Sequence, residues 1–158
     1  MTQTGFSVTV FKTATGEVVS STRHTSDGDE NFKALVIANI LTTWGDGYGV
    51  AEGDANPTDE FYVQFLDETA IIVRKPDLIV HVEDDKTTIE SGGEDYTTLT
   101  GLPDPCTIII DDPDPGVATQ EIEVTGGGFI FEADDPGVYT IEIRRFPFLP
   151  FRMEITAT

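Results

Sequence analysis

Clustered carboxylates are the groups in this chain best suited to binding an ion. Asp111, Asp112 and Asp114 fall within four consecutive positions, and residues 27–30 read Asp-Gly-Asp-Glu. Several hard oxygen ligands in one loop are what Ca²⁺ requires, so both segments are calcium candidates, although neither follows the twelve-residue loop of an EF-hand. Aspartate is also common in turns, because its side chain caps nearby amides. We therefore favour the interpretation of both segments as solvated acidic turns.

Groups that could support catalysis are few and scattered. The two histidines, His24 and His81, have no cysteine or second histidine at metal-ligand spacing. Residues 45–49 read Gly-Asp-Gly-Tyr-Gly, but Val50 stands where a dinucleotide-binding fingerprint needs its third glycine. Cys106 is the only cysteine, and its β-type surroundings favour a small buried side chain over a reactive thiol. We predict no catalytic residue, no cofactor and no enzymatic activity.

The charge balance of the chain is strongly acidic. Its 158 residues include 29 Asp and Glu against nine Lys and Arg, for a formal net charge of −20. This charge repels nucleic acids and anionic lipids, so we expect no nucleic-acid partner. No stretch approaches the ~20 apolar residues of a membrane helix, and the first residues do not resemble a signal peptide. We expect no membrane insertion, and a protein that stays in the cytoplasm or leaves it within a larger assembly.

The first half of the chain alternates strands with one helix. Phe6, Val8 and Val10 alternate with Ser7, Thr9 and Phe11 in the pattern of a strand. Residues 17–22 continue as a second strand after a turn at Gly16. Residues 61–66 and 70–73 have the composition of a second hairpin. We expect residues 1–76 to form a small α+β domain of hairpin, helix and hairpin.

A single convincing helix is predicted over residues 30–44. Its apolar residues recur at helical spacing, and they are Phe32, Leu35, Val36, Ile40 and Leu41. Asp27 or Asp29 is available as the N-cap, and the glycines of the 45–47 segment end the helix.

The second half of the chain has the pattern of a β-sandwich. Short apolar runs alternate with turns rich in Pro, Asp and Gly, and they occupy residues 97–100, 106–110, 120–124, 128–131, 138–143 and 152–156. Residues 77–96 contain two further short runs and the Ser-Gly-Gly-Glu-Asp segment at 91–95, which has the composition of a linker. The expected fold class is therefore mainly β, with connecting strands and a linker at 77–96 and a sandwich domain at 97–158.

The run from Phe146 to Phe151 combines large apolar side chains with two prolines. Proline prevents regular strand pairing, so this run is not expected to be an ordinary strand. One interpretation is a rigid connection that packs onto its own chain, and the alternative is an exposed patch that docks a partner subunit. The candidate interface residues are Phe146, Phe148, Leu149 and Phe151.

Several short motifs follow one another along the chain, at residues 11–19, 50–53, 61–63, 74–76, 99–103, 136–139 and 146–149. In this order they are similar to a strand, Thr-Gly turn and strand, a Val-x-Glu-Gly stretch, a segment ending in Tyr-Val, an Arg-Pro element, a Leu-Pro motif, a Pro-Gly-Thr-Tyr motif and a Pro-Tyr-Leu turn. With these motifs the chain resembles small proteins encoded beside tail-fibre and tail-tip genes of siphophages and prophages. The chain departs from the pattern in its longer helix, in Lys75, which splits the Arg-Pro pair, and in an enlarged turn at 113–116.

The resemblance implies a non-enzymatic virion structural protein, a tail-fibre or tail-tip component with an immunoglobulin-like second half. It further implies other virion proteins as partners, several copies per particle, a host surface receptor as a further partner, and a virion location after synthesis in the host cytoplasm. A capsid decoration protein and a tail-fibre assembly chaperone are alternatives of the same class. A carbohydrate-binding module is the alternative outside it, with Trp44, Tyr48 and Tyr62 as platform aromatics.

Overall fold

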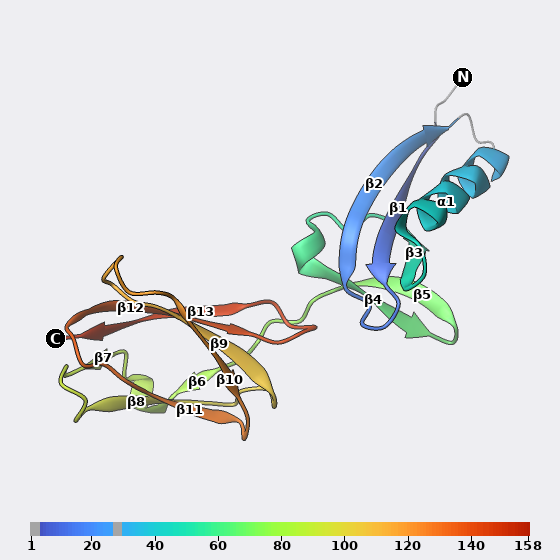
Figure 1. Cartoon of the computed structure of the whole chain (residues 1–158). Helices are drawn as coiled ribbons and strands as arrows, with labels where there is room; N and C mark the ends of the chain where they lie inside the picture. The colour runs from blue at the N-terminus through green and yellow to red at the C-terminus, as the bar shows by residue number, and fades with distance from the viewer. Residues whose placement is uncertain (1–3, 27–29) are drawn as a thin grey trace. The chain divides into compact units, whose positions relative to one another are not determined.

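The computed structural model describes residues 4–26 and 30–158, and its fold is mainly β with one α-helix. The chain divides into two compact units, Met1–Lys75 and Pro76–Thr158. Figure 1 shows the first unit in blue to green and the second in green to red. The expected mainly-β fold class is confirmed, and the two units are described separately below.

The first unit contains a three-stranded antiparallel sheet of order β2-β1-β3 and a β4–β5 hairpin. The strands are β1 (Thr4–Lys12), β2 (Val18–Ser26), β3 (Tyr48–Glu52), β4 (Phe61–Leu66) and β5 (Thr69–Arg74), with the 3₁₀ turn η1 (Thr58–Glu60) before β4. The turn between β1 and β2 depends on Gly16, which has φ +78 and whose added Cβ would lie 2.0 Å from the Val63 carbonyl oxygen. The core of this unit joins the sheet to the hairpin through Phe11, Val18, Ala51, Ala55 and Val63.

The helix α1 (Glu30–Trp44) has the predicted bounds and lies beside β3 in Figure 1. It ends at Gly45, whose amide donates to the Leu41 carbonyl (2.9 Å). Both proposed N-caps, Asp27 and Asp29, lie outside the described residues. No residue of α1 is buried, so the apolar periodicity of this segment does not mark a face sealed within the unit.

The second unit is a sandwich of two sheets, of order β10-β9-β12-β13-β7 and β11-β8-β6. Its elements are β6 (His81–Val82), the 3₁₀ turn η2 (Glu83–Asp85), β7 (Thr88–Ile89), β8 (Tyr96–Thr100), β9 (Cys106–Asp111), β10 (Gln120–Val124), β11 (Gly128–Glu132), β12 (Gly137–Arg144) and β13 (Phe151–Ala157). Alternate residues of both sheets point inward, and the most deeply buried include Leu99, Ile108, Ile141, Ile143 and Ile155. They form one hydrophobic cluster, as expected for sheets packed face to face.

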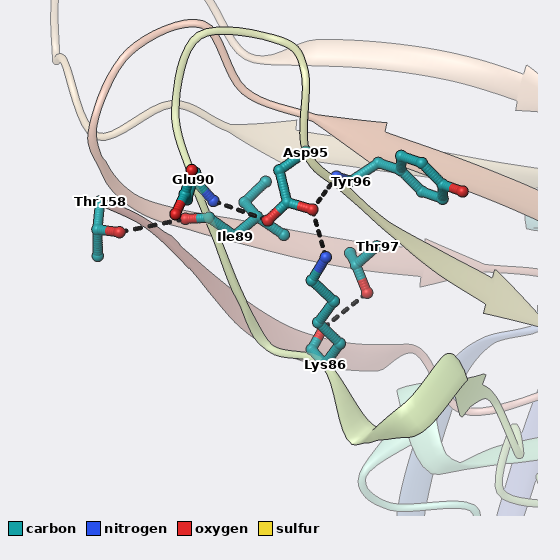
Figure 2. A network of polar contacts seen from close by, with 7 residues as sticks. All are labelled: Lys86, Ile89, Glu90, Asp95, Tyr96, Thr97 and Thr158. Carbon is teal, nitrogen blue, oxygen red and sulfur yellow. Dashed lines mark hydrogen bonds and ion pairs between the residues drawn. The ribbon is translucent and has the colours of Figure 1, made fainter.

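Residues 77–96 belong to this sandwich and do not form a connection between domains. β6 pairs with β8, and β7 pairs in parallel with β13, so both segments complete sheets of the second unit. Figure 2 shows how Asp95 ties the supposed linker together: its carboxylate accepts from the amides of Glu90 (3.0 Å) and Tyr96 (2.9 Å) and pairs with Lys86. A flexible composition predicted a linker, whereas the carboxylate of Asp95 fixes the segment as a tight loop.

The strand order of the second unit is immunoglobulin-like. β6, β8 and β11 correspond to strands A, B and E, and they face β10, β9, β12 and β13 in the positions of C′, C, F and G. Tyr139 near the start of β12 donates its hydroxyl to the Asp135 carbonyl (2.9 Å), which is the tyrosine corner of such folds. Within residues 4–26 and 30–158, no helix is long and apolar enough to span a bilayer.

Candidate interaction surfaces

The helix α1 presents an uncharged apolar surface to solvent. Ala34, Ala38 and Leu41 follow the i, i+4, i+7 spacing of one helix face, Leu35 borders them, and all four are exposed. We call these four residues the outer face of α1. Leu35 keeps 58% of its surface exposed, and residues 34–44 contain no charged side chain. An uncharged surface of this kind on a chain of net charge −20 is a candidate contact for another protein.

Aromatic side chains at the edges of α1 pack against the sheet. Phe32 meets Phe6 of β1 edge-on, with 6.3 Å between ring centroids. The rings of Trp44 and Tyr48 lie 5.2 Å apart and are tilted by 53°. Tyr62, the third aromatic residue of the expected carbohydrate platform, lies on β4. The tilted Trp44–Tyr48 pair differs from the flat platform on which a sugar ring stacks.

The Phe146–Phe151 run forms the β12–β13 connection, and most of it packs onto its own unit. Phe148 and Phe151 contact the hydrophobic cluster of the sandwich. The Phe148 amide donates to the Arg145 carbonyl (2.8 Å), and the Leu149 amide donates to the Pro76 carbonyl (2.9 Å). Phe146 differs, because 38% of its surface stays exposed. Of the four candidate interface residues, Phe148 and Phe151 pack against the cluster, Leu149 is half-buried, and Phe146 is the most exposed.

Arginine side chains surround the start of this connection. Glu142 on β12 is 6% exposed and pairs with Arg144 on its own strand and with Arg152, its cross-strand neighbour on β13. Burial alone raises the pKa of Glu142, but the hydrogen bonds from the two guanidinium groups outweigh burial and lower the pKa below its ordinary value. Among the residues that the structure describes, no carboxylate lies within ion-pair distance of Arg145.

Arg144, Arg145 and Phe146 together form what we call the basic end of the sandwich. A pocket of about 240 Å³ opens between them and the residues Pro105, Cys106, Thr107 and Glu123. Cys106 is itself buried, and burial raises the pKa of its thiol, so this sulfur is a poor nucleophile. The pocket is suited to contact with a charged or polar group of another molecule through its arginines.

A larger depression of about 390 Å³ lies between β10 and β11, the edge strands of the two sheets. Apolar residues supply one part of its lining, namely Ile110, Val117, Ile122, Phe129, Ile130 and Phe131. Carboxylates supply another part, namely Asp112, Glu132, Asp134 and Asp135. We call this depression the acidic groove. Tyr139 closes one side of it, and burial followed by the charges of the nearby aspartates raises the pKa of that phenol.

The carboxylates of the calcium candidates at residues 111–114 form hydrogen bonds within the loop that contains them. The carboxylates of Asp112 and Asp114 accept from the amides of Asp114 (2.9 Å) and Gly116 (2.8 Å), and Asp111 accepts from the Thr119 hydroxyl (2.7 Å). Within the described part of the chain, no group of three or more metal-ligating side chains is arranged to hold an ion. Residues 27–29 of the second candidate segment lie outside the described residues.

The histidines have local roles in separate units. His24 stacks on Phe6 with 5.4 Å between ring centroids, and its Nε2 forms a hydrogen bond with Thr22 (3.1 Å). His81 lies on β6 beside Thr100 of β8. Thr22 and His24 are two residues apart on β2, and the hydrogen bond between them is exposed to solvent.

The acidic groove is not visible as a pattern in the sequence. Its residues come from β9, β10, β11, β12 and the loops after β9 and β11, so they gather only through the folding of the sandwich. A usable signal was present in β11, where Phe129, Ile130 and Phe131 are consecutive and cannot all face one core.

Comparison with protein families and with curated proteins finds no match for this chain.

Proposed function

We propose that this chain is a non-catalytic structural component of a bacteriophage particle, a tail-fibre or tail-tip protein present in several copies. Its mechanism is association with other virion proteins. The observation that carries the association is the outer face of α1, where Leu35 and Leu41 are exposed in an uncharged surface. The assignment to a phage tail is supported by the ordered motifs that resemble proteins encoded beside tail genes.

The energetics favour a covered α1. Fully burying one exposed leucine side chain contributes about 1.5–3 kcal/mol. Leu35 and Leu41 keep 58% and 39% of their surface exposed, so a partner that covers both recovers about 1.5–3 kcal/mol in total. The absence of charge over residues 34–44 means that a partner meets this surface without desolvating an ion. A surface with charged side chains would not combine exposed apolar area with the absence of an ion to desolvate.

The experiment is mass spectrometry of purified particles, with tails and filled heads analysed separately. A tail component is expected in the tail fraction at several copies per particle. Enrichment in heads would favour a capsid decoration protein, and absence from both fractions would favour an assembly chaperone. Either of these results would overturn the tail assignment.

A pair of variants tests the association itself. Leu35→Gln with Leu41→Gln is expected to leave folding intact and to reduce incorporation into particles at least tenfold. Leu66→Gln is the matched control, because Leu66 is equally exposed, at 60%, but lies on β4. If particles incorporate the double leucine variant and the Leu66→Gln control equally well, α1 is not the contact.

Broad substrate profiling of the pure protein tests the non-catalytic role. Turnover that is lost in a His24→Ala, His81→Ala double variant would refute that role.

A further inference from the structure

The two surfaces of the sandwich lie at opposite ends of the same strands. β9 begins at Cys106, in the pocket of the basic end, and its last inward residue, Ile110, lines the acidic groove. β12 runs the other way, from Tyr139 in the groove to Arg144 at the basic end. At about 3.3 Å per residue, the two sites are separated by on the order of 17 Å along β12. One copy of the unit therefore presents them to different neighbours.

The charges of the two surfaces are complementary. Residues 76–158 hold 18 acidic and four basic residues, and three of those four are Arg144, Arg145 and Arg152 around one end. Glu142 pairs with Arg144 and Arg152, and Glu123 also lines the pocket, but Arg145 has no carboxylate within ion-pair distance among the described residues. The groove is lined by the carboxylates of Asp112, Glu132, Asp134 and Asp135. Arg145 at one end of the unit thus matches the carboxylates that line the groove at the other end.

The apolar parts also match. Phe146 exposes its ring next to Arg145, and the groove has an apolar lining that includes Ile122 and Phe129. An aromatic ring that enters such a groove removes apolar area from water, while the adjacent guanidinium reaches carboxylates at the rim. Hot spots in protein interfaces combine an aromatic anchor and an arginine in this way.

We propose that the basic end of one copy docks into the acidic groove of a second copy, so that the chain associates head to tail. Such an interface is heterologous, because it joins two different surfaces, and it therefore builds a ring or an open filament. The inference deepens the proposed function and rests on it in one respect, that several copies assemble in a particle. At 0.15 M salt the screening length is about 8 Å, so the repulsion between copies of net charge −20 is weakened at longer range.

The test is charge reversal in the full chain, read by sedimentation velocity between about 1 µM and 1 mM protein. Wild type is expected to show reversible, concentration-dependent growth. Arg145→Glu, and separately Asp134→Lys with Asp135→Lys, are each expected to weaken self-association at least tenfold. An equimolar mixture of the two variant proteins is expected to restore it, since each then offers the surface that the other lacks. Controls with the same charge changes elsewhere are Arg74→Glu, and Asp46→Lys with Asp59→Lys, and these are expected to associate like wild type.

Three results would overturn the proposal. The first is a monomeric wild type up to 1 mM, the second is unchanged association in both reversal variants, and the third is a mixture that does not recover association. If particles nevertheless incorporate Arg145→Glu normally, the tail assignment stands and only head-to-tail docking fails. If particles lose the Asp134→Lys, Asp135→Lys protein while wild type is monomeric in solution, the groove binds a basic segment of another virion protein, and self-docking is rejected.

Discussion

The hydroxyl of Tyr139 donates a hydrogen bond to the backbone carbonyl of Asp135, four residues earlier in the chain (2.9 Å). This bond ties the start of β12 to the turn that precedes it, where Asp134 and Asp135 line the acidic groove. The Tyr139 ring also meets Phe131 of β11 edge-on, with 5.3 Å between ring centroids. Tyr139 therefore couples the packing of the two sheets to the position of the groove carboxylates.

We predict that Tyr139→Phe destabilises the second unit by about 1 kcal/mol, the net value of one hydrogen bond. The ring remains, so the contact with Phe131 survives and the loss comes from the hydroxyl alone. Urea unfolding followed by amide NMR signals of the second unit measures the effect. Tyr96→Phe is the control, because Tyr96 is half exposed and should change stability by less than about 0.5 kcal/mol. Equal losses in both variants would contradict a specific role for the corner.

Glu142 makes stability depend on pH in a defined direction. Its pKa in the folded state lies below the unfolded value, so its contribution to stability is present above the unfolded pKa of about 4.3 and is lost as pH falls through the folded pKa. We predict that Glu142→Gln costs about 1–2 kcal/mol at pH 7, because two charge-assisted hydrogen bonds lose their acceptor. The gap between wild type and variant should narrow as the pH falls below about 4.3 and through the lower folded-state pKa of Glu142. Glu154→Gln, a change on an exposed residue of β13, should show neither effect.

The strand pattern of the chain was largely predictable, and so was α1. Periodicity placed α1 at residues 30–44, and turn chemistry separated most strands of the second unit. Burial was less predictable, because the helical spacing of Leu35 and Leu41 indicates an apolar face without showing whether the chain itself covers it. The linker prediction at 91–95 failed because composition does not register that Asp95 accepts from two backbone amides and pairs with Lys86.

The candidate surfaces were predictable only where they are local in sequence. The Phe146–Phe151 run was visible as an unusual segment, but its division into packed Phe148 and exposed Phe146 depends on the fold of the sandwich around it. The acidic groove joins Asp112 to Glu132 across two edge strands. Such a site arises from pairing between distant segments, and no local pattern of the sequence encodes it.

Gly16 and Gly45 provide a matched pair for the close contact in the first unit. Both have φ +78, but a Cβ on Gly45 meets nothing within 4 Å, whereas one on Gly16 would lie 2.0 Å from the Val63 carbonyl oxygen. We predict that Gly45→Ala costs about 1–2 kcal/mol, the cost of a left-handed backbone with a side chain. Gly16→Ala should cost a further ~1–3 kcal/mol from overpacking. Thermal unfolding followed by the fluorescence of Trp44 measures the stability of both variants. Equal costs would show that the turn at Gly16 shifts to accommodate the added Cβ without overpacking.

Phe148 and Phe146 separate the two roles of the run between β12 and β13. Phe148 contacts the hydrophobic cluster of the sandwich, so Phe148→Ser should lower the free energy of unfolding by about 2 kcal/mol, less than for a fully buried phenylalanine.

Phe146 keeps 38% of its surface in water, and Phe146→Ser should lower the free energy of unfolding by less than Phe148→Ser does. Its main effect should appear in self-association, where the loss of the aromatic anchor weakens the head-to-tail contact about tenfold or more. Chemical denaturation and sedimentation velocity on the same two proteins provide both readouts. A Phe146→Ser protein that unfolds more easily and associates like wild type would show that this ring serves the fold of its own unit.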